Sequence, residues 1–119
     1  MNICKKCNSL QLPELKVKNG VIINGAHFYP EMVRILNVAR VTAPELTDNT
    51  IWVTSANDSA HMSGSLHYEN KAFDLRTWNI VGGEKSAEFW VARMALALGG
   101  DYDVILEKDH IHIELDPEV

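Results

Sequence analysis

The stretch Ser65–Arg76 reads S-L-H-Y-E-N-K-A-F-D-L-R, and its partner near the C-terminus, Glu107–Glu114, reads E-K-D-H-I-H-I-E. Together they offer two imidazoles and one carboxylate, from His67, Asp74 and His112. A catalytic zinc ion takes three protein ligands of this kind and leaves its fourth position to a water molecule. The two stretches therefore predict a zinc site.

The spacing within each stretch allows these side chains to meet. Residues 72–76 roughly alternate polar and apolar, which predicts a strand with Asp74 on one face and Phe73 in the core. A turn at residues 70–71 can fold His67 back beside Asp74. In His110–Glu114 the same alternation places both histidines on one face of a second strand. The three candidate ligands can thus converge from two strands and a turn.

These motifs resemble the superfamily that joins the zinc D-Ala-D-Ala carboxypeptidases, the other LAS-type peptidoglycan peptidases and the N-terminal signalling domain of hedgehog proteins. The resemblance consists of a His, six residues and an Asp, followed tens of residues later by His-x-His. Among these relatives the hedgehog-like members are most similar in sequence. The similar part is S-L-H-Y-E-N-K-A-F-D, followed by a helix and by a short hairpin that ends in H-I-H. It covers roughly residues 51–115, about half of the chain.

The resemblance implies a role for each matching residue. His67 and Asp74 would be the first two zinc ligands, and His112 would be the third. His110 would stand beside the metal without binding it, placed to hydrogen-bond a substrate carbonyl or the oxyanion. His61, six residues before His67, matches a second histidine of this kind in hedgehog-like members. Hedgehog domains also bind calcium through acids near this loop, but only Asp58 is acidic here, so calcium is not expected.

Two carboxylates compete for the role of general base, which the family places just before the last zinc histidine. Glu107 and His110 flank Lys108-Asp109, a pair that suits a two-residue hairpin loop, so Glu107 is expected on the same face as the histidines. Asp109 is expected to point elsewhere. It nevertheless stands at the offset that some carboxypeptidases of the superfamily use for their Glu, so the assignment of the base stays open between the two.

Two neighbouring side chains complete the expected site. Ser65 is expected to order the turn around His67 or to form a hydrogen bond with one of the metal ligands. For Arg76, on the same strand face as Asp74, a surface ion pair is the favoured role and contact with a substrate carboxylate is the alternative.

The remaining patterns predict an α+β domain, with a mostly antiparallel sheet that carries the site on one face and two helices packed on the other. The 3.6-residue period predicts helices from Pro30 to before Pro44 and from Glu84 to Leu98, the second stopped by Gly99-Gly100. Further strands are expected at residues 51–54 and 102–106. Asn19-Gly20 predicts a hairpin over residues 15–23.

Composition limits the possible functions. The 119 residues suit a single domain over 1–119, with residues 1–13 as a loosely ordered N-terminal segment. Cys4 and Cys7 form a C-x-x-C without a second pair, which favours two reduced thiols. A net charge of -5 argues against nucleic acid, and no apolar run is long enough for a membrane span. A monomer is favoured.

The sequence therefore predicts a zinc metallopeptidase that hydrolyses peptidoglycan stem or cross-link peptides, as a DD-carboxypeptidase, an endopeptidase or a phage endolysin. The alternative is a catalytically silent, zinc-stabilised binding or signalling module of the hedgehog-like type. The N-terminus lacks the layout of a signal peptide, so synthesis in the cytoplasm is expected. By family-level analogy, a phage-encoded wall enzyme released to the cell wall would fit.

Overall fold

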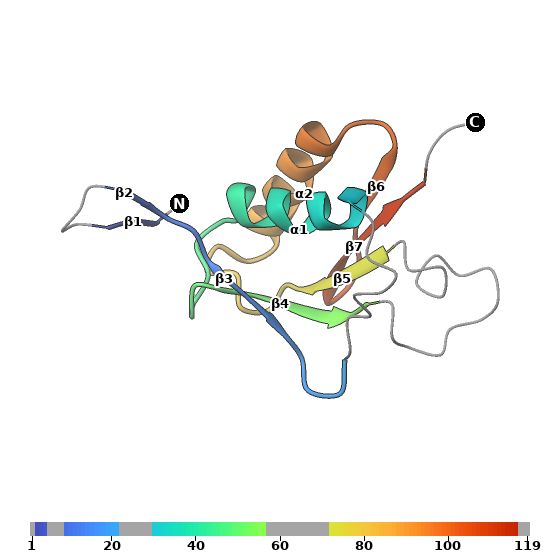
Figure 1. Ribbon diagram of the computed structural model, residues 1–119. Helices are drawn as coiled ribbons and strands as arrows, with labels where there is room; N and C mark the ends of the chain where they lie inside the picture. The colour runs from blue at the N-terminus through green and yellow to red at the C-terminus, as the bar shows by residue number, and fades with distance from the viewer. Residues whose placement is uncertain (1, 5–8, 22–29, 57–71, 117–119) are drawn as a thin grey trace.

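The protein folds as an α+β domain in which two helices cover one face of a five-stranded mixed sheet (Figure 1). The computed structural model describes residues 2–4, 9–21, 30–56 and 72–116. The elements in chain order are β1 (Asn2–Cys4), β2 (Ser9–Gln11), β3 (Glu14–Val17), α1 (Pro30–Thr42), β4 (Thr50–Ser55), β5 (Ala72–Arg76), α2 (Gly83–Leu98), β6 (Tyr102–Leu106) and β7 (His110–Leu115). The α+β class and the two packed helices are confirmed.

The sheet has the strand order β3-β4-β5-β7-β6, and β1 pairs with β2 in a separate two-stranded sheet. The strands β4, β5, β7 and β6 pair antiparallel with their neighbours, whereas β3 pairs parallel with β4. A parallel pair needs a crossover, which α1 provides between β3 and β4. The sheet is therefore mixed, and β5 and β7 lie inside it rather than at an edge.

The second strand of the predicted hairpin over residues 15–23 lies mostly outside the described residues. The Asn19-Gly20 turn forms, since the Val21 N–H donates to the Lys18 carbonyl over 3.0 Å and Gly20 has a φ of 88°. However, β3 pairs with β4, and Val21 lies outside any strand; residues 22 and 23 are outside the described ranges.

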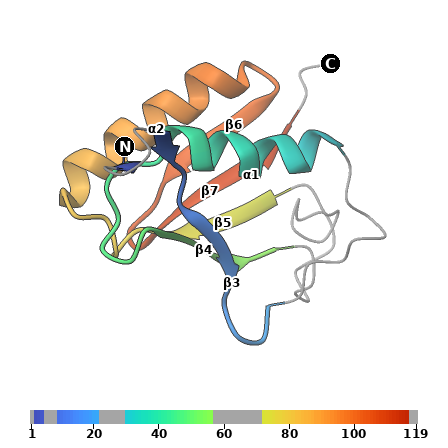
Figure 2. The same cartoon turned by 60° about the vertical axis from the view of Figure 1, so that its left-hand side comes forward.

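The helices form where the sequence predicts them, because each carries an apolar stripe with a 3.6-residue period. In α1 the buried residues include Met32, Ile35 and Ala39, and in α2 they include Trp90 and Met94. Both helices lie across the same face of the sheet, as the turned view in Figure 2 also shows. Gly99, with a φ of 91°, ends α2 as expected. Neither described helix is long and apolar enough to cross a membrane.

Alternation along the strands separates the two faces of the sheet. The side chains toward the helices are fully buried, and they include Val53, Phe73, Leu75, Ile111 and Ile113. Each such side chain contributes about 1.5–3 kcal/mol by leaving water. The intervening residues form the opposite face, which we call the site face: Trp52, Thr54, Asp74, Arg76, His110, His112 and Glu114.

Candidate metal centre on the site face

The site face brings Asp74 and His112 into direct contact. They are Cα partners in the antiparallel pair of β5 and β7, so their side chains leave the sheet side by side. His112 Nδ1 donates a hydrogen bond to Asp74 Oδ1 over 2.9 Å, and both side chains are 17% exposed. This hydrogen bond raises the pKa of His112 above its ordinary value, although burial acts in the opposite direction. Two of the three predicted ligands therefore lie together.

The distance between these two atoms suits a shared metal ion. Two ligands that each lie about 2.0 Å from a tetrahedral zinc ion are about 3.3 Å apart, close to the observed 2.9 Å. An imidazole and a carboxylate are also the donor types that zinc accepts. The third predicted ligand, His67, lies outside the described residues, as do His61 and Ser65. Among the described residues, Asp74 and His112 thus offer two donor groups of types that zinc accepts.

The other ring nitrogen of His112 faces a second carboxylate. His112 Nε2 lies 3.7 Å from Glu114 Oε2. Ligating histidines commonly hold their second ring nitrogen near a carboxylate, which fixes the orientation of the ring. His112 therefore has Asp74 on the side of Nδ1 and Glu114 on the side of Nε2. The sequence analysis missed Glu114, although the spacing His-x-Glu on an alternating strand could have indicated it.

His110 lies at the end of the site face nearest the hairpin loop. The Glu107 N–H donates to the His110 carbonyl over 2.8 Å, which gives the predicted two-residue loop. Glu107 Oε2 lies 3.6 Å from His110 Nε2, so Glu107 does share a face with the histidine. The same nitrogen lies 4.0 Å from Asp74 Oδ2. His110 and Glu107 thus border the candidate metal centre.

Asp109 was expected to point away from the site, and the structure shows a different position. Its carboxylate accepts a hydrogen bond from His110 Nδ1 over 2.7 Å. This bond lowers the pKa of Asp109 below its ordinary value. The reason is the tight loop, which leaves Asp109 directly beside the ring of the next residue. Asp109 therefore helps to orient His110.

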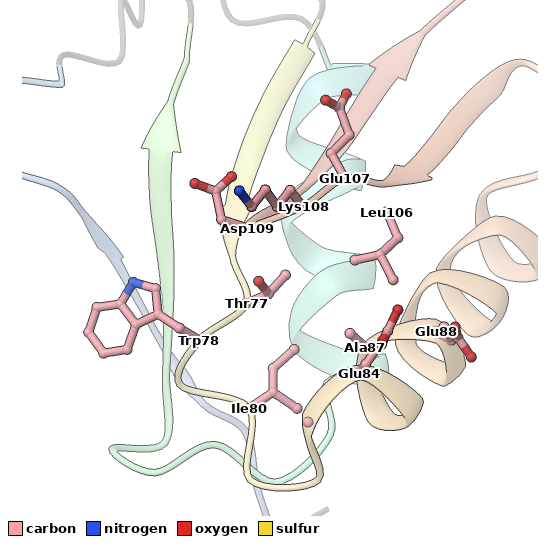
Figure 3. Close-up of a pocket in the computed structure, with 11 residues that line it drawn as sticks. Thr77, Trp78, Ile80, Glu84, Ala87, Glu88, Leu106, Glu107, Lys108 and Asp109 are labelled. Atoms are coloured by element: carbon pink, nitrogen blue, oxygen red, sulfur yellow. The ribbon is translucent and has the colours of Figure 1, made fainter.

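Two cavities open near this cluster and share Trp78 and Asp109. The larger, of about 860 Å³, lies between the chain after β5, the first turns of α2 and the hairpin loop (Figure 3). Ile80, Ala87 and Leu106 contribute apolar surface to it. The smaller, of about 280 Å³, is lined by Lys18, Thr54, Ser55, Asp74, Arg76, Trp78, Asp109 and His110. Asp74 and His110 line the smaller cavity, whereas Glu107 lines the larger one.

Arg76 does not form the surface ion pair that the sequence favoured with any carboxylate of the described ranges. Its guanidinium contacts two indole rings instead, 5.0 Å from the centroid of Trp52 and 4.2 Å from that of Trp78. Arg76 and Trp78 are two residues apart, a spacing visible in the sequence. The contribution of Trp52 depends on the pairing of β4 with β5, which the sequence does not fix.

A second group of acids lies beyond His112. Asp103, Glu114 and Asp116 could together hold a cation, since their ligand atoms lie within 4.8 Å of one another. Asp103 and Glu114 are Cα partners across β6 and β7. Glu114 therefore belongs to this acidic cluster and also borders His112. An experiment on metal binding therefore has to distinguish the pair of Asp74 and His112 from this acidic cluster.

Comparison of this chain with protein family models, with curated proteins and with solved structures gave no match in any of the three.

Proposed function

We propose that this protein is a zinc-dependent peptidase of the LAS or D-Ala-D-Ala carboxypeptidase type, which hydrolyses peptidoglycan stem or cross-link peptides. The observation that carries the proposal is the contact of Asp74 with His112 over 2.9 Å, beside Glu107 and His110 on the site face. A metal-ligand pair with a carboxylate and an imidazole beside it is one set of groups that can hydrolyse an amide.

His67, Asp74 and His112 would hold the zinc ion. When bound, zinc supplies a Lewis acid for the scissile carbonyl and lowers the pKa of a water molecule to about 7. Asp74 and His112 are placed by neighbouring strands inside the sheet, so their positions depend on strand register rather than on a loop. This placement favours a stable metal centre.

Glu107 is the better general base of the two candidates. Its carboxylate is 49% exposed and lies at the edge of the site, 3.6 Å from His110 Nε2, where it can accept a proton from water and pass it to the leaving amine. Asp109 is already hydrogen-bonded to His110, and its lowered pKa makes it a weaker proton acceptor. Asp109 then serves to hold the His110 ring in place.

His110 can stabilise the charge that develops on the carbonyl oxygen. Because its Nδ1 is bound to Asp109, its Nε2 is the nitrogen that faces Asp74 and Glu107. Nε2 becomes a donor when the ring carries both protons, and a donor fixed in this way loses little freedom when the substrate arrives. By the family resemblance, His61 would assist from the other side.

The first experiment is mass spectrometry of defined muropeptides after incubation with the zinc-loaded protein, with and without a chelator. We expect a product that the chelator suppresses, and its mass identifies the cleaved bond. The Glu107→Gln variant should show turnover that is reduced by about 10²-fold or more, and its zinc content should be unchanged. Glu45→Gln, on an exposed residue of the connection after α1, is a matched control and should retain turnover.

Two results would contradict this account in different ways. Intact muropeptides with stoichiometric zinc would exclude the peptidase and favour the silent, zinc-stabilised module of the hedgehog-like type. Unchanged turnover in Glu107→Gln would keep the peptidase and move the base to Asp109 or another residue.

A further inference from the structure

The outward face of α2 is apolar, although α2 lies at the surface. The residues that α2 buries against the core are Ala87, Trp90, Met94 and Leu98. Roughly 180° around the helix lie four exposed residues, which we call the outer stripe: Lys85, Phe89, Ala92 and Leu96. Phe89 is 66% exposed and Leu96 is 87% exposed. A surface helix normally places polar side chains opposite its buried stripe, so the outer stripe indicates a contact with another molecule.

A hollow lies at one end of the outer stripe, between the end of α1 and the first turns of α2. It has a volume of about 270 Å³, and its lining residues are Thr42, Pro44, Lys85, Ser86, Phe89 and Trp90. Lys85 and Phe89 thus belong both to the hollow and to the outer stripe. Leu96 projects from α2 about two turns further along the helix. The same surface therefore carries an exposed apolar side chain and a hollow that such a side chain can enter.

The outer stripe is complementary to itself when two copies of α2 run antiparallel. In a two-fold contact, a residue that meets a second residue of the other copy is met in the same way by that copy. With the axis between residues 92 and 93, Phe89 faces Leu96 of the second copy, because both lie about 5 Å from the axis along the helix. Leu96 can then enter the hollow beside Phe89. The small side chain of Ala92, at the centre, lets the two helices approach closely.

The charges at the two ends of the outer stripe suit the same arrangement. Lys85 lies about 11 Å from the proposed axis along the helix, and Asp101 follows the other end of α2. Both residues are exposed, and neither forms an ion pair within the ranges that the structure describes. In the antiparallel contact Lys85 approaches Asp101 of the second copy, which carries the opposite charge. Arg93, beside the stripe, can lay its methylene groups over Ala92 of the second copy and keep its charge in water.

We infer that this protein forms a two-fold dimer through the outer stripe of α2, with a second copy of the chain as the partner. The inference does not depend on the proposed peptidase function. The helices and the site face lie on opposite sides of the sheet, so the dimer presents its two site faces on opposite sides (Figures 1 and 2). A polymer with repeated ligands can then bind at both sites, which raises its apparent affinity.

Sedimentation velocity of the full chain over a range of protein concentrations tests the inference. We expect a species of twice the chain mass of 13.4 kDa that dissociates on dilution, since one pair of helices is a small interface. Leu96→Glu should weaken the dimer about tenfold or more, because it places a charge in an apolar contact. Leu96 is 87% exposed, so this variant should keep its fold, which circular dichroism checks. Ile105→Glu makes a matched change at a residue that is 46% exposed on the site face, and its dimer should be as stable as that of the wild type.

An exchange of charges tests the antiparallel register. Lys85→Glu should weaken the dimer about twofold to fivefold, and the combination of Lys85→Glu with Asp101→Lys should restore it. Failure of the double variant to restore association would overturn the arrangement. So would a wild-type protein that stays monomeric at every concentration, or a dimer that Leu96→Glu leaves intact. Binding of a monomer to phosphatidylglycerol vesicles, abolished by Leu96→Glu, would assign the outer stripe to a membrane surface instead.

Discussion

The replacement Glu114→Gln should weaken zinc binding, although Glu114 is not one of the expected ligands. Glutamine keeps the shape of the side chain and removes its charge. Glu114 Oε2 faces Nε2 of His112, the nitrogen on the opposite side of the ring from Asp74. Loss of the charge should make the imidazole a poorer ligand and release its orientation.

The size of the effect follows from the distance. Removal of a carboxylate behind a ligating histidine typically reduces metal affinity by about 10- to 100-fold. The separation of 3.7 Å is longer than a direct hydrogen bond, so the lower end of that range applies. We expect a loss of about tenfold, which corresponds to about 1.4 kcal/mol.

Competition with a chromogenic zinc chelator measures this affinity, and Asp103→Asn is the matched control. Asp103 opposes Glu114 across the strand pair and belongs to the same acidic cluster, whereas Glu114 is the acid that lies 3.7 Å from His112 Nε2. Its replacement also removes one negative charge close by. We expect less than about a twofold change in zinc affinity for Asp103→Asn, since charges at a distance are screened.

The reasoning is refuted if Glu114→Gln and Asp103→Asn weaken zinc binding equally. Equal losses would mean that the ion occupies the acidic cluster of Asp103, Glu114 and Asp116, or that only the general field of the acids matters. No loss in either variant would show that Glu114 does not support His112.

Two further predictions concern stability, measured by denaturant unfolding of the metal-free protein. Ile111→Ala should lower the free energy of unfolding by about 2–5 kcal/mol, because Ile111 is fully buried. Ile105 lies on the opposite face and is 46% exposed, so Ile105→Ala should lower the free energy of unfolding by less than about 1 kcal/mol. Equal losses would contradict the assignment of the two faces. The raised pKa of His112 stabilises the folded state below the ordinary histidine pKa of about 6.5, and this contribution should disappear as the pH rises through the folded-state pKa. His112→Gln should flatten that part of the pH profile, and an unchanged profile would refute the role of His112.

The elements that follow local patterns could be predicted from the sequence. Pro30 and Pro44 bracket α1, and the alternation of residues 72–76 and 110–114 defines β5 and β7. The short Lys108-Asp109 loop fixes which residues of β6 and β7 oppose each other. That local information was sufficient to place Asp74, His110 and His112 on one face.

Features that depend on distant pairing could not be predicted in the same way. The Asn19-Gly20 turn is a local signal, whereas β3 pairs with β4, which follows α1 in the chain. The contact of Arg76 with both indole rings likewise needs the register between β4 and β5, which includes an irregularity between Val53 and Ser55. Asp109 was misplaced because a residue in a two-residue loop follows no alternation.

The precision of the candidate centre comes from the core behind it. A slip of β5 by one residue against β7 would turn Asp74 toward the helices, away from His112, and expose Phe73, which is now fully buried. The same burial that holds the sheet together therefore selects the single register in which carboxylate and imidazole meet. Core packing thus places the Asp74 carboxylate and the His112 imidazole within hydrogen-bond distance of each other.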